Sequence, residues 1–349
     1  MRKSGEKCET IVMLPSNRQH DLIGTGPQFH KRLGVAEALE KLGWRVDFMD
    51  VNEWPRNPFA GKPSLYSSID PWRAMRILFG KRRAFAVLSY YQSGVLLVLA
   101  LRRLLGFKPL VVIVDIAQDE GWRVRTRIVR FCLARADAVF AFASAQAEYL
   151  SRKYRTDAVR FLPQQTDTDF YCPGPEPEED FVLSVGTDIS RDYGTLKEAI
   201  FGLGLPIVLK TTLVAEDRER FPLVTVVRER LNDAAFRLLY RRARIVAIAL
   251  HDMLHPGGIT TLLESLACGK AVVVSDSRGV RDYLHHEENC LVVPSGDAGA
   301  MREAVLRLMK DDALRTRLAR NARAYAEEQL SQIHHAERLA VAIRAAAAA

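Results

Sequence analysis

The sequence predicts an α/β protein made of two doubly wound, Rossmann-like lobes that face a cleft, and three observations support this. The chain has 349 residues, which suits two domains of roughly 150 to 180 residues better than one core. Short apolar runs alternate with helical patterns, as in βαβ units around a parallel sheet. A segment rich in proline and acidic residues, 172–180, separates two such series.

The first series begins with a strand at 11–14, an amphipathic helix at 27–44 and a second strand at 45–51. Residues 53–72 contain several Pro and Gly residues and predict a long surface loop. The remaining elements of this series are a strand at 84–90, a helix at 94–105, a strand at 110–115, a helix at 122–137 and a strand at 138–142.

The second series repeats the alternation after the separating segment. Its predicted strands are 181–186, 206–212, 223–227, 244–250, 271–276 and 290–293. Its predicted helices are 191–203, 232–243, one that starts at 280, and long helices from 297 to the end. The domains are therefore predicted as 1–174 and 175–332, with a C-terminal helix at 333–349 that packs back on the first lobe.

Composition limits the function classes without selecting one. Lys and Arg total 50 against 42 Asp and Glu, a net charge of +8 that fits an anionic substrate, an acidic membrane surface or nucleic acid. The basic residues are dispersed and no stacking aromatics interleave with them in a known module, so nucleic-acid binding is not expected. The five cysteines form no C-x-x-C pair, which indicates thiols in a reducing cytoplasm and argues against the usual structural zinc site.

Two apolar stretches predict buried elements of the fold, not export or membrane insertion. The run at 11–14 stops at Pro15 and predicts a first strand, not a signal peptide. The run at 84–106 is interrupted by polar residues and glycine near its middle, so each half is too short to span a bilayer. We expect a cytoplasmic protein.

The stretch HPGGITTLLESLACGKAVVVSD, residues 255–276, carries the strongest chemical signal. Gly257 and Gly258 allow close approach of a ligand to the backbone, and the helix that follows offers unpaired N–H groups. Thr260 and Thr261 add hydroxyl donors in its first turn. These features suit a diphosphate.

Glu264, one turn further along, repels phosphate but can accept two hydrogen bonds from a vicinal diol such as ribose. Phosphate donors at a helix tip and a diol acceptor on the next turn together describe a nucleotide-sugar site. The alternative is an ordinary helix start whose Glu complements the helix dipole.

A family resemblance covers the same residues. GGITTLLESLACGKAVVVSDSRGVRDYL, followed by ENCLVVPSGD, resembles the donor-site region of retaining GT-B glycosyltransferases, the group that includes glycogen synthase and many bacterial sugar transferases. Further segments resemble that family in the expected order from about residue 84 to 330, among them RFLPQQTDTDFYCP, FVLSVGTDISRDYGTLKEA and LLYRRARIVAIAL.

The resemblance implies a transferase that moves a sugar, with retention, from a nucleoside-diphosphate sugar to a hydroxyl of a polysaccharide, lipid-linked glycan or natural product. It implies that the donor binds the C-terminal lobe and the acceptor the N-terminal lobe. The ribose contact maps onto Glu264, and the phosphate-binding backbone amides map onto Gly257, Gly258 and Ile259, with Thr260 and Thr261 nearby. No metal and no cofactor are expected.

A basic pair that neutralises the leaving diphosphate is also implied. Arg191 follows the strand that ends at Gly186, and Lys210 ends the strand PIVLK, so these two are assigned. The alternatives are a solvated arginine and an interlobe salt bridge.

The chain departs from the family pattern at two places. Pro256 occupies the position of the first Glu, the usual sugar contact; Asp252, His251 and His255 are near enough to substitute for it, or are loop residues outside the site. The family often has a His after an N-lobe strand, where this chain has Asp115, with Asp119 nearby. Asp115 is assigned to orient the acceptor or act as a weak base, and a helix cap is the alternative.

Two further features of the first lobe are candidates for binding. Gly24, Gly26 and His30 lie in or near a glycine-containing loop before a helix and are expected at the cleft. The helix from Trp122 to Arg135 carries five arginines and could contact anionic lipid at the inner membrane face; the alternative is a solvated basic face.

Two other functions fit the same layout: a nucleotide-sugar epimerase and a nucleotide-sugar-binding subunit without turnover. The sequence does not determine the sugar, the nucleotide base, the acceptor or the oligomeric state.

Overall fold

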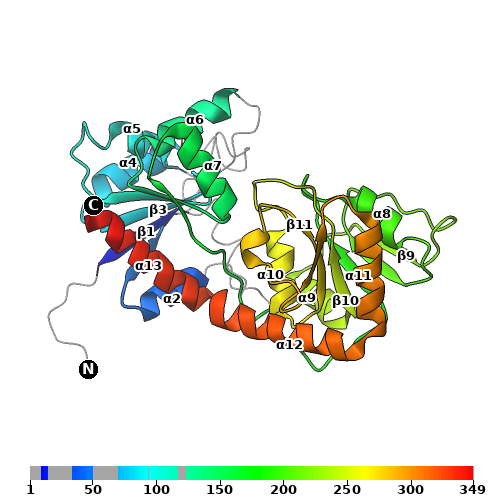
Figure 1. The fold of residues 1–349 in the computed structure, drawn as a ribbon. Coiled ribbons are helices and arrows are strands. Elements are labelled where there is room, and N and C mark those ends of the chain that lie inside the picture. Colours follow the sequence, from blue (N-terminus) through cyan, green and yellow to red (C-terminus); the bar gives the residue numbers. More distant parts are fainter. Residues whose placement is uncertain (1–8, 15–33, 50–69, 93, 117–122, 349) are drawn as a thin grey trace. The chain divides into compact units, whose positions relative to one another are not determined.

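The computed structural model describes residues 9–14, 34–49, 70–92, 94–116 and 123–348. The contacts among residues divide the chain into two compact units (Figure 1). Unit 1 comprises the described residues up to Pro163 together with the C-terminal segment from His335, and unit 2 comprises Gln164–His334. The C-terminal segment thus belongs to the first unit. The boundaries between the units lie after residues 163 and 334, whereas the sequence predicted boundaries after residues 174 and 332.

Unit 1 contains a six-stranded sheet in the order β2-β1-β3-β4-β5-β6, in which neighbouring strands are parallel. The central strands are apolar on both faces, as expected when helices cover both sides. The strands are β1 Thr10–Leu14, β2 Arg45–Phe48, β3 Ala86–Tyr90, β4 Leu110–Val114, β5 Ala138–Ala141 and β6 Val159–Phe161.

Helices α4, α5, α6 and α7 share one core with alternate residues of this sheet. Ile77, Val98, Val129 and Leu150, one from each helix, are fully buried in it. The described helices of unit 1 are α2 Gly34–Lys41, α4 Pro71–Gly80, α5 Leu96–Leu101, α6 Arg123–Leu133, α7 Ser144–Tyr154 and most of α13 Gln332–Ala348.

Helix α4 was not predicted from the sequence, where a predicted loop ended at Trp72 and nothing was assigned before the strand at 84. Its start signal is local: the Asp70 side chain accepts a hydrogen bond from the Arg73 N–H at 3.1 Å, and Pro71 occupies the first turn. The sequence prediction placed this start signal inside the loop that it ended at Trp72, and the helix was missed for that reason. Residues 53–69 of the predicted loop lie outside the described residues.

Unit 2 contains the second sheet, in the order β12-β11-β10-β7-β8-β9, again parallel throughout. This is the doubly wound order in which the chain reverses direction across the sheet between β7 and β10, the position where such sheets bind ligands. The strands are β7 Val182–Val185, β8 Ile207–Lys210, β9 Val224–Val227, β10 Ile245–Ile248, β11 Val272–Asp276 and β12 Leu291–Pro294.

Helices cover both faces of this sheet: α8 and α11 lie side by side on one face, and α9 and α10 lie on the other (Figure 1). The helix expected from residue 280 is a single 3-10 turn, η1 Arg281–Tyr283, after which the chain runs without further helix to β12 at Leu291. The helices of this unit are α8 Tyr193–Ile200, α9 Asp233–Arg242, α10 Ile259–Ala267, α11 Ala298–Lys310 and α12 Asp312–Gln329.

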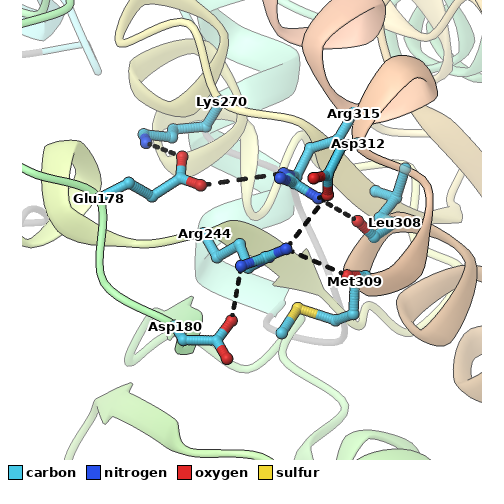
Figure 2. A network of polar contacts seen from close by, with 8 residues as sticks. All are labelled: Glu178, Asp180, Arg244, Lys270, Leu308, Met309, Asp312 and Arg315. Atoms are coloured by element: carbon cyan, nitrogen blue, oxygen red, sulfur yellow. Dashed lines mark hydrogen bonds and ion pairs between the residues drawn. The ribbon is translucent and has the colours of Figure 1, made fainter.

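An ion-pair network fixes the end of the predicted linker within unit 2 (Figure 2). Glu178 accepts from Lys270 at 3.0 Å and lies 3.8 Å from Arg315, while Arg244 contacts Asp180 at 3.0 Å. Arg244 and Arg315 both also reach the carboxylate of Asp312 at the start of α12. Glu178 and Asp180, although exposed, are therefore held against unit 2 by ion pairs.

None of the helices in the described ranges is long and apolar enough to cross a bilayer.

His335, near the start of α13, is buried at 2% exposure beside the end of β6 in unit 1. Its Nδ1 lies 2.7 Å from the Pro163 carbonyl oxygen, and its ring meets Phe142 edge to face. Burial lowers the pKa of His335 to about 4, although the Pro163 carbonyl opposes this. The imidazole is therefore neutral in the folded protein at neutral pH.

This burial predicts a loss of stability in mild acid. Because the folded-state pKa lies below the unfolded value, the unfolded chain binds more protons, and the contribution of His335 to stability falls by about 3 kcal/mol as pH drops from about 6.5 to about 4. Across this range the melting temperature of His335→Phe, measured relative to that of the parent, should rise as the pH is lowered. His334→Gln, on the same helix, is the control and should keep the parent slope; identical slopes for all three proteins would contradict the assignment.

Candidate functional site

The loops after β7 and β10 meet at the position where unit 2 reverses its strand order. Arg191 and Leu250 form an antiparallel bridge, and the N–H of His251 donates to the Ser190 carbonyl at 2.8 Å. The N–H of Asp192 donates to Ala249 at 3.0 Å. These backbone bonds hold the two loops in one rigid assembly at the carboxyl edge of the sheet.

The glycine turn before α10 leaves backbone donors without acceptors. Gly258 adopts a left-handed φ of 86° and precedes the helix without any side-chain cap. A Cβ on Gly257 would overlap the Ser190 side chain, so only glycine allows the two loops to pack this closely. Among the described residues, no group accepts a hydrogen bond from the N–H of Gly258, Thr260 or Thr261. This helix start can therefore bind an anion.

Arg191 supplies a buried cation at the same helix start. Its side chain is only 6% exposed; Nε contacts Asp188 at 3.0 Å and Nη2 donates to the Thr261 hydroxyl at 3.0 Å. Its buried Nη1 has no hydrogen-bond partner in the described ranges, and a Cβ on Gly258 would lie 3.4 Å from it. One guanidinium N–H group thus remains unsatisfied beside the free helix amides, which is unusual for a buried charged group.

Gly186 makes room for this guanidinium. Its φ is 147°, and a Cβ there would overlap the Arg191 side chain. The Tyr193 hydroxyl donates to the Gly186 carbonyl at 2.9 Å, which fixes the turn after β7.

Lys210, the other predicted cation, lies next to this turn. It ends β8 in register with Val185, and its carbonyl accepts from the Gly186 N–H at 3.1 Å. Within the described part of the chain its half-buried side chain has no ion-pair partner. Lys210 and Arg191 therefore flank the end of β7 from two sides.

The two threonines of α10 differ in their surroundings. Thr261 is 4% exposed, accepts from Arg191 and lies 3.5 Å from the Val185 carbonyl. Thr260 is exposed to solvent. The hydroxyl of Thr261 therefore positions the guanidinium, a role that the sequence did not predict.

Glu264 is buried at 7% exposure on the second turn of α10. Its Oε2 accepts from the Tyr240 hydroxyl at 2.8 Å, and the Tyr171 hydroxyl also hydrogen-bonds to it. Burial and the nearby Glu264 charge raise the pKa of Tyr171 and of Tyr240. Neither tyrosine was predicted from the sequence, since only tertiary packing brings them to Glu264.

The loop after β11 supports the turn that contains His255 and Pro256. Asp252 accepts from the Arg278 backbone and side chain at 3.0 and 3.1 Å, and a Cβ on Gly279 would overlap the His255 carbonyl. Asp252, a candidate substitute for the sugar contact, is thus held in an ion pair. His255 lies directly before the glycine turn.

In unit 1, Asp115 follows β4 and is 4% exposed. Its backbone is left-handed with φ 57°, as are those of Tyr91 and Gln92 after the neighbouring strand β3. Its carboxyl accepts a hydrogen bond from Tyr91, but the buried Oδ1 has no partner among the residues that the structure describes. Burial raises the pKa of Asp115 to about 7, opposed by the Tyr91 hydrogen bond. An unsatisfied buried carboxyl and three strained residues thus mark the carboxyl edge of this sheet.

Gly24, Gly26, His30 and Asp119 lie outside the described residues. No group of three or more His, Cys, Asp and Glu side chains within the described ranges is arranged to hold a metal ion.

Comparison with solved structures identifies the architecture. The chain is similar over 97% of its length to sucrose-phosphate synthase from Thermosynechococcus elongatus, with 20% identity, 99% of that chain covered and a TM-score of 0.74. It is similar over 97% of its length to HepE from Anabaena, with 13% identity, complete coverage of that chain and a TM-score of 0.67. The fold is GT-B. The prediction of two Rossmann-like α/β lobes is confirmed.

Sequence comparison finds similarity to glycosyltransferases in part of the chain. Residues 225–325, which include α10 and its glycine turn, match the family model of glycosyl transferases group 1. A Campylobacter jejuni N,N'-diacetylbacillosaminyl-diphospho-undecaprenol alpha-1,3-N-acetylgalactosaminyltransferase is 27% identical over 161 residues. That match covers 42% of this chain and 43% of the relative, so this chain matches less than half of the relative's length.

Proposed function

We propose that this GT-B protein transfers a sugar from a nucleoside-diphosphate sugar to a hydroxyl group of an acceptor. The observation that carries the proposal is the anion site at the start of α10, where the unpartnered Nη1 of Arg191 lies beside the unpaired N–H groups of Gly258, Thr260 and Thr261. The family match spans this helix start, and HepE structures contain UDP and UDP-glucose.

In the proposed reaction the acceptor oxygen bonds to the anomeric carbon as the bond from that carbon to the diphosphate breaks, with retention. The nucleoside diphosphate leaves with the bonding electrons, and Arg191, Lys210 and the helix amides stabilise its growing charge. The acceptor proton passes to Asp115 on unit 1. Glu264, held by Tyr240, accepts hydrogen bonds from the ribose hydroxyls.

No metal takes part in this proposal, because the cationic side chains and the helix start supply the charge that a divalent ion would otherwise supply. Transfer is expected to continue in excess EDTA. Activity that disappears on chelation and returns with added magnesium would refute this part.

The acceptor in the name of the Campylobacter jejuni relative carries a diphospho-undecaprenol group. We include a lipid-linked acceptor in the proposal, alongside polysaccharide and natural-product hydroxyls. Such an acceptor would require peripheral contact with an anionic membrane, at its cytoplasmic face.

The proposed donor site is tested by thermal shift with nucleoside diphosphates and their sugars. A true ligand at about 100 times its Kd should add about 3 kcal/mol of stability. If Glu264 binds ribose, Glu264→Gln and removal of the 2'-hydroxyl from the best ligand should each weaken binding, and their effects should not add. Additive effects would remove Glu264 from the ribose contact.

A transfer assay then separates this function from its two alternatives. Donor loss together with a glycosylated acceptor supports transfer. Donor conversion without any acceptor indicates an epimerase, and tight binding without turnover indicates a binding subunit.

A further inference from the structure

Helix α4 of unit 1 exposes three large apolar side chains. Trp72 is 49% exposed, Met75 43% and Phe79 56%. Their spacing of three and four residues places them on one side of the helix, while Ile77 and Leu78 face the core. The helix therefore has one apolar side against the protein and another toward solvent.

A fourth exposed apolar residue lies in the turn after the neighbouring helix α5. Leu104 is 83% exposed, and Arg82 donates to the Leu105 and Gly106 carbonyls of this turn at 2.8 and 3.1 Å. The turn is thus tied to the end of α4, and α4 and α5 lie side by side in Figure 1. We call Trp72, Met75, Phe79 and Leu104 the α4–α5 surface.

The exposed charges that residues 70–110 contribute around this surface have one sign. Residues 70–110 contain eight Lys and Arg but a single acidic residue, Asp70, which is buried as the N-terminal cap of α4. Lys81 and Arg102 are ion-paired to Asp47 and Asp137. Exposed cations of the same region are Arg76, Arg82, Arg83, Arg103 and Lys108.

We propose that the α4–α5 surface docks unit 1 on an anionic lipid bilayer. Exposed apolar side chains interleaved with cations match the boundary of such a bilayer, where acyl chains accept the apolar groups and phosphates face the cations. A protein partner would have to bring several acidic residues into one interface, whose core is normally poor in charge. The inference locates the membrane contact of the proposed function, but it does not depend on sugar transfer.

Helix α6, which the sequence predicted for lipid contact, is a weaker candidate. Ile128 and Phe131 pack against the core of unit 1. Arg135 stacks on Phe131 at 4.3 Å, and Arg130 lies 5.8 Å from the Tyr154 ring. In its described part this helix therefore presents cations without exposed large apolar side chains.

The direction of α4 relates the surface to the edge that carries Asp115. Its C-terminus leads into β3, so Phe79 lies toward the amino edge of the sheet and Trp72 toward the carboxyl edge, about 10 Å further along the helix. Asp115 follows a strand at that carboxyl edge. A bilayer on this surface would therefore present lipid-linked hydroxyls on the side of unit 1 where Asp115 lies.

The test is flotation of the whole protein with vesicles, without any sugar donor. The parent should float with phosphatidylcholine vesicles that contain phosphatidylglycerol as roughly one lipid in three, and less with pure phosphatidylcholine or in high salt. The triple variant Trp72→Ser, Met75→Ser, Phe79→Ser should lose more than about 90% of this binding. Changing Arg76, Arg83 and Arg103 to Gln should weaken binding about fivefold per charge.

Matched variants on unit 1 control for general effects. Val341→Ser removes a side chain that is 70% exposed on α13, and Arg127→Gln with Arg130→Gln removes charge from α6; both should float like the parent. Unchanged melting temperatures and nucleotide binding verify folding.

Four results would overturn the proposal. The first is no flotation of the parent, the second is full flotation of the triple variant, and the third is loss only with the α6 variant. The last is found by light scattering without lipid, which tests whether the surface binds a second copy of this protein. If the parent is a dimer and the triple variant a monomer, the surface is a subunit interface and not a membrane contact. Failure of sugar transfer would leave all these readouts unaffected.

Discussion

Replacing Arg191 with Met is expected to lower the turnover number of sugar transfer by about 10²- to 10³-fold while unit 2 stays folded. The guanidinium is held by Asp188 and Thr261, and its remaining Nη1 is directed at no protein acceptor. A group positioned in this way gives most of its interaction energy to a negative charge that grows in the transition state. The turnover number should therefore fall more than the Michaelis constant rises.

Stability provides the second readout for this variant. Met leaves Asp188, whose pKa the guanidinium lowers, and the Thr261 hydroxyl without this partner, so Arg191→Met should lower the free energy of unfolding by about 1 to 3 kcal/mol. Arg191→Lys keeps the charge but loses the planar fork and should recover only part of the activity.

The control is Arg242→Met, which breaks an ion pair with Glu179 at the far end of α9, away from the carboxyl edge. It should leave turnover unchanged. Parent-like kinetics in folded Arg191→Met would remove this residue from the site.

The fold was predictable because buried parallel strands carry their own signal. Segments such as LVVIV and AVVVSD are continuous β-branched runs, and the helices between them have clear periodicity. Helix α4 was missed because its start signal, Asp70 and Pro71, was assigned to the preceding loop, although its buried residues recur at helical spacing.

The geometry of the candidate site was predictable only where local spacing determines it. Glycines before a helix and a Glu on its second turn fix positions along one element, so α10 could be assigned from sequence. The contact of Tyr171 and Tyr240 with Glu264 could not, since it joins segments far apart in the chain. The pairing of Arg191 with Thr261 depends in the same way on the strand order of the folded sheet.

Asp115 and His335 bias the acid stability of unit 1 in opposite directions. The folded-state pKa of Asp115, about 7, lies above its unfolded value, so the folded protein binds more protons and its stability falls as pH rises from about 4 to about 7. His335 contributes the opposite slope over a similar range. The two contributions should largely cancel in the parent, and single variants should reveal each one.

Replacing Asp115 with Asn is therefore expected to reduce transfer and to stabilise the protein together. Asn also tolerates a left-handed backbone and can still accept from Tyr91, so neither strain nor a lost hydrogen bond confuses the result. Turnover should fall about 100-fold if the carboxylate takes the acceptor proton. At pH 8 the variant should gain up to about 4 kcal/mol, since it no longer holds an ionised buried carboxyl.

The pH profile distinguishes this role from a structural one. Parent activity should rise with pH through about 7 as Asp115 ionises, whereas the residual activity of Asp115→Asn should be flat in that range. Asp137→Asn is the matched control. This carboxylate accepts hydrogen bonds from Arg102 at 2.6 and 2.8 Å and from the Val111 N–H at 2.7 Å. Its loss should therefore lower the stability of the protein and leave the pH profile of activity unchanged. A carboxyl whose removal stabilises the fold but slows the reaction is one that the fold retains for chemistry. An Asp115→Asn variant with parent rate and parent pH profile would show that the unsatisfied oxygen serves no step of the transfer.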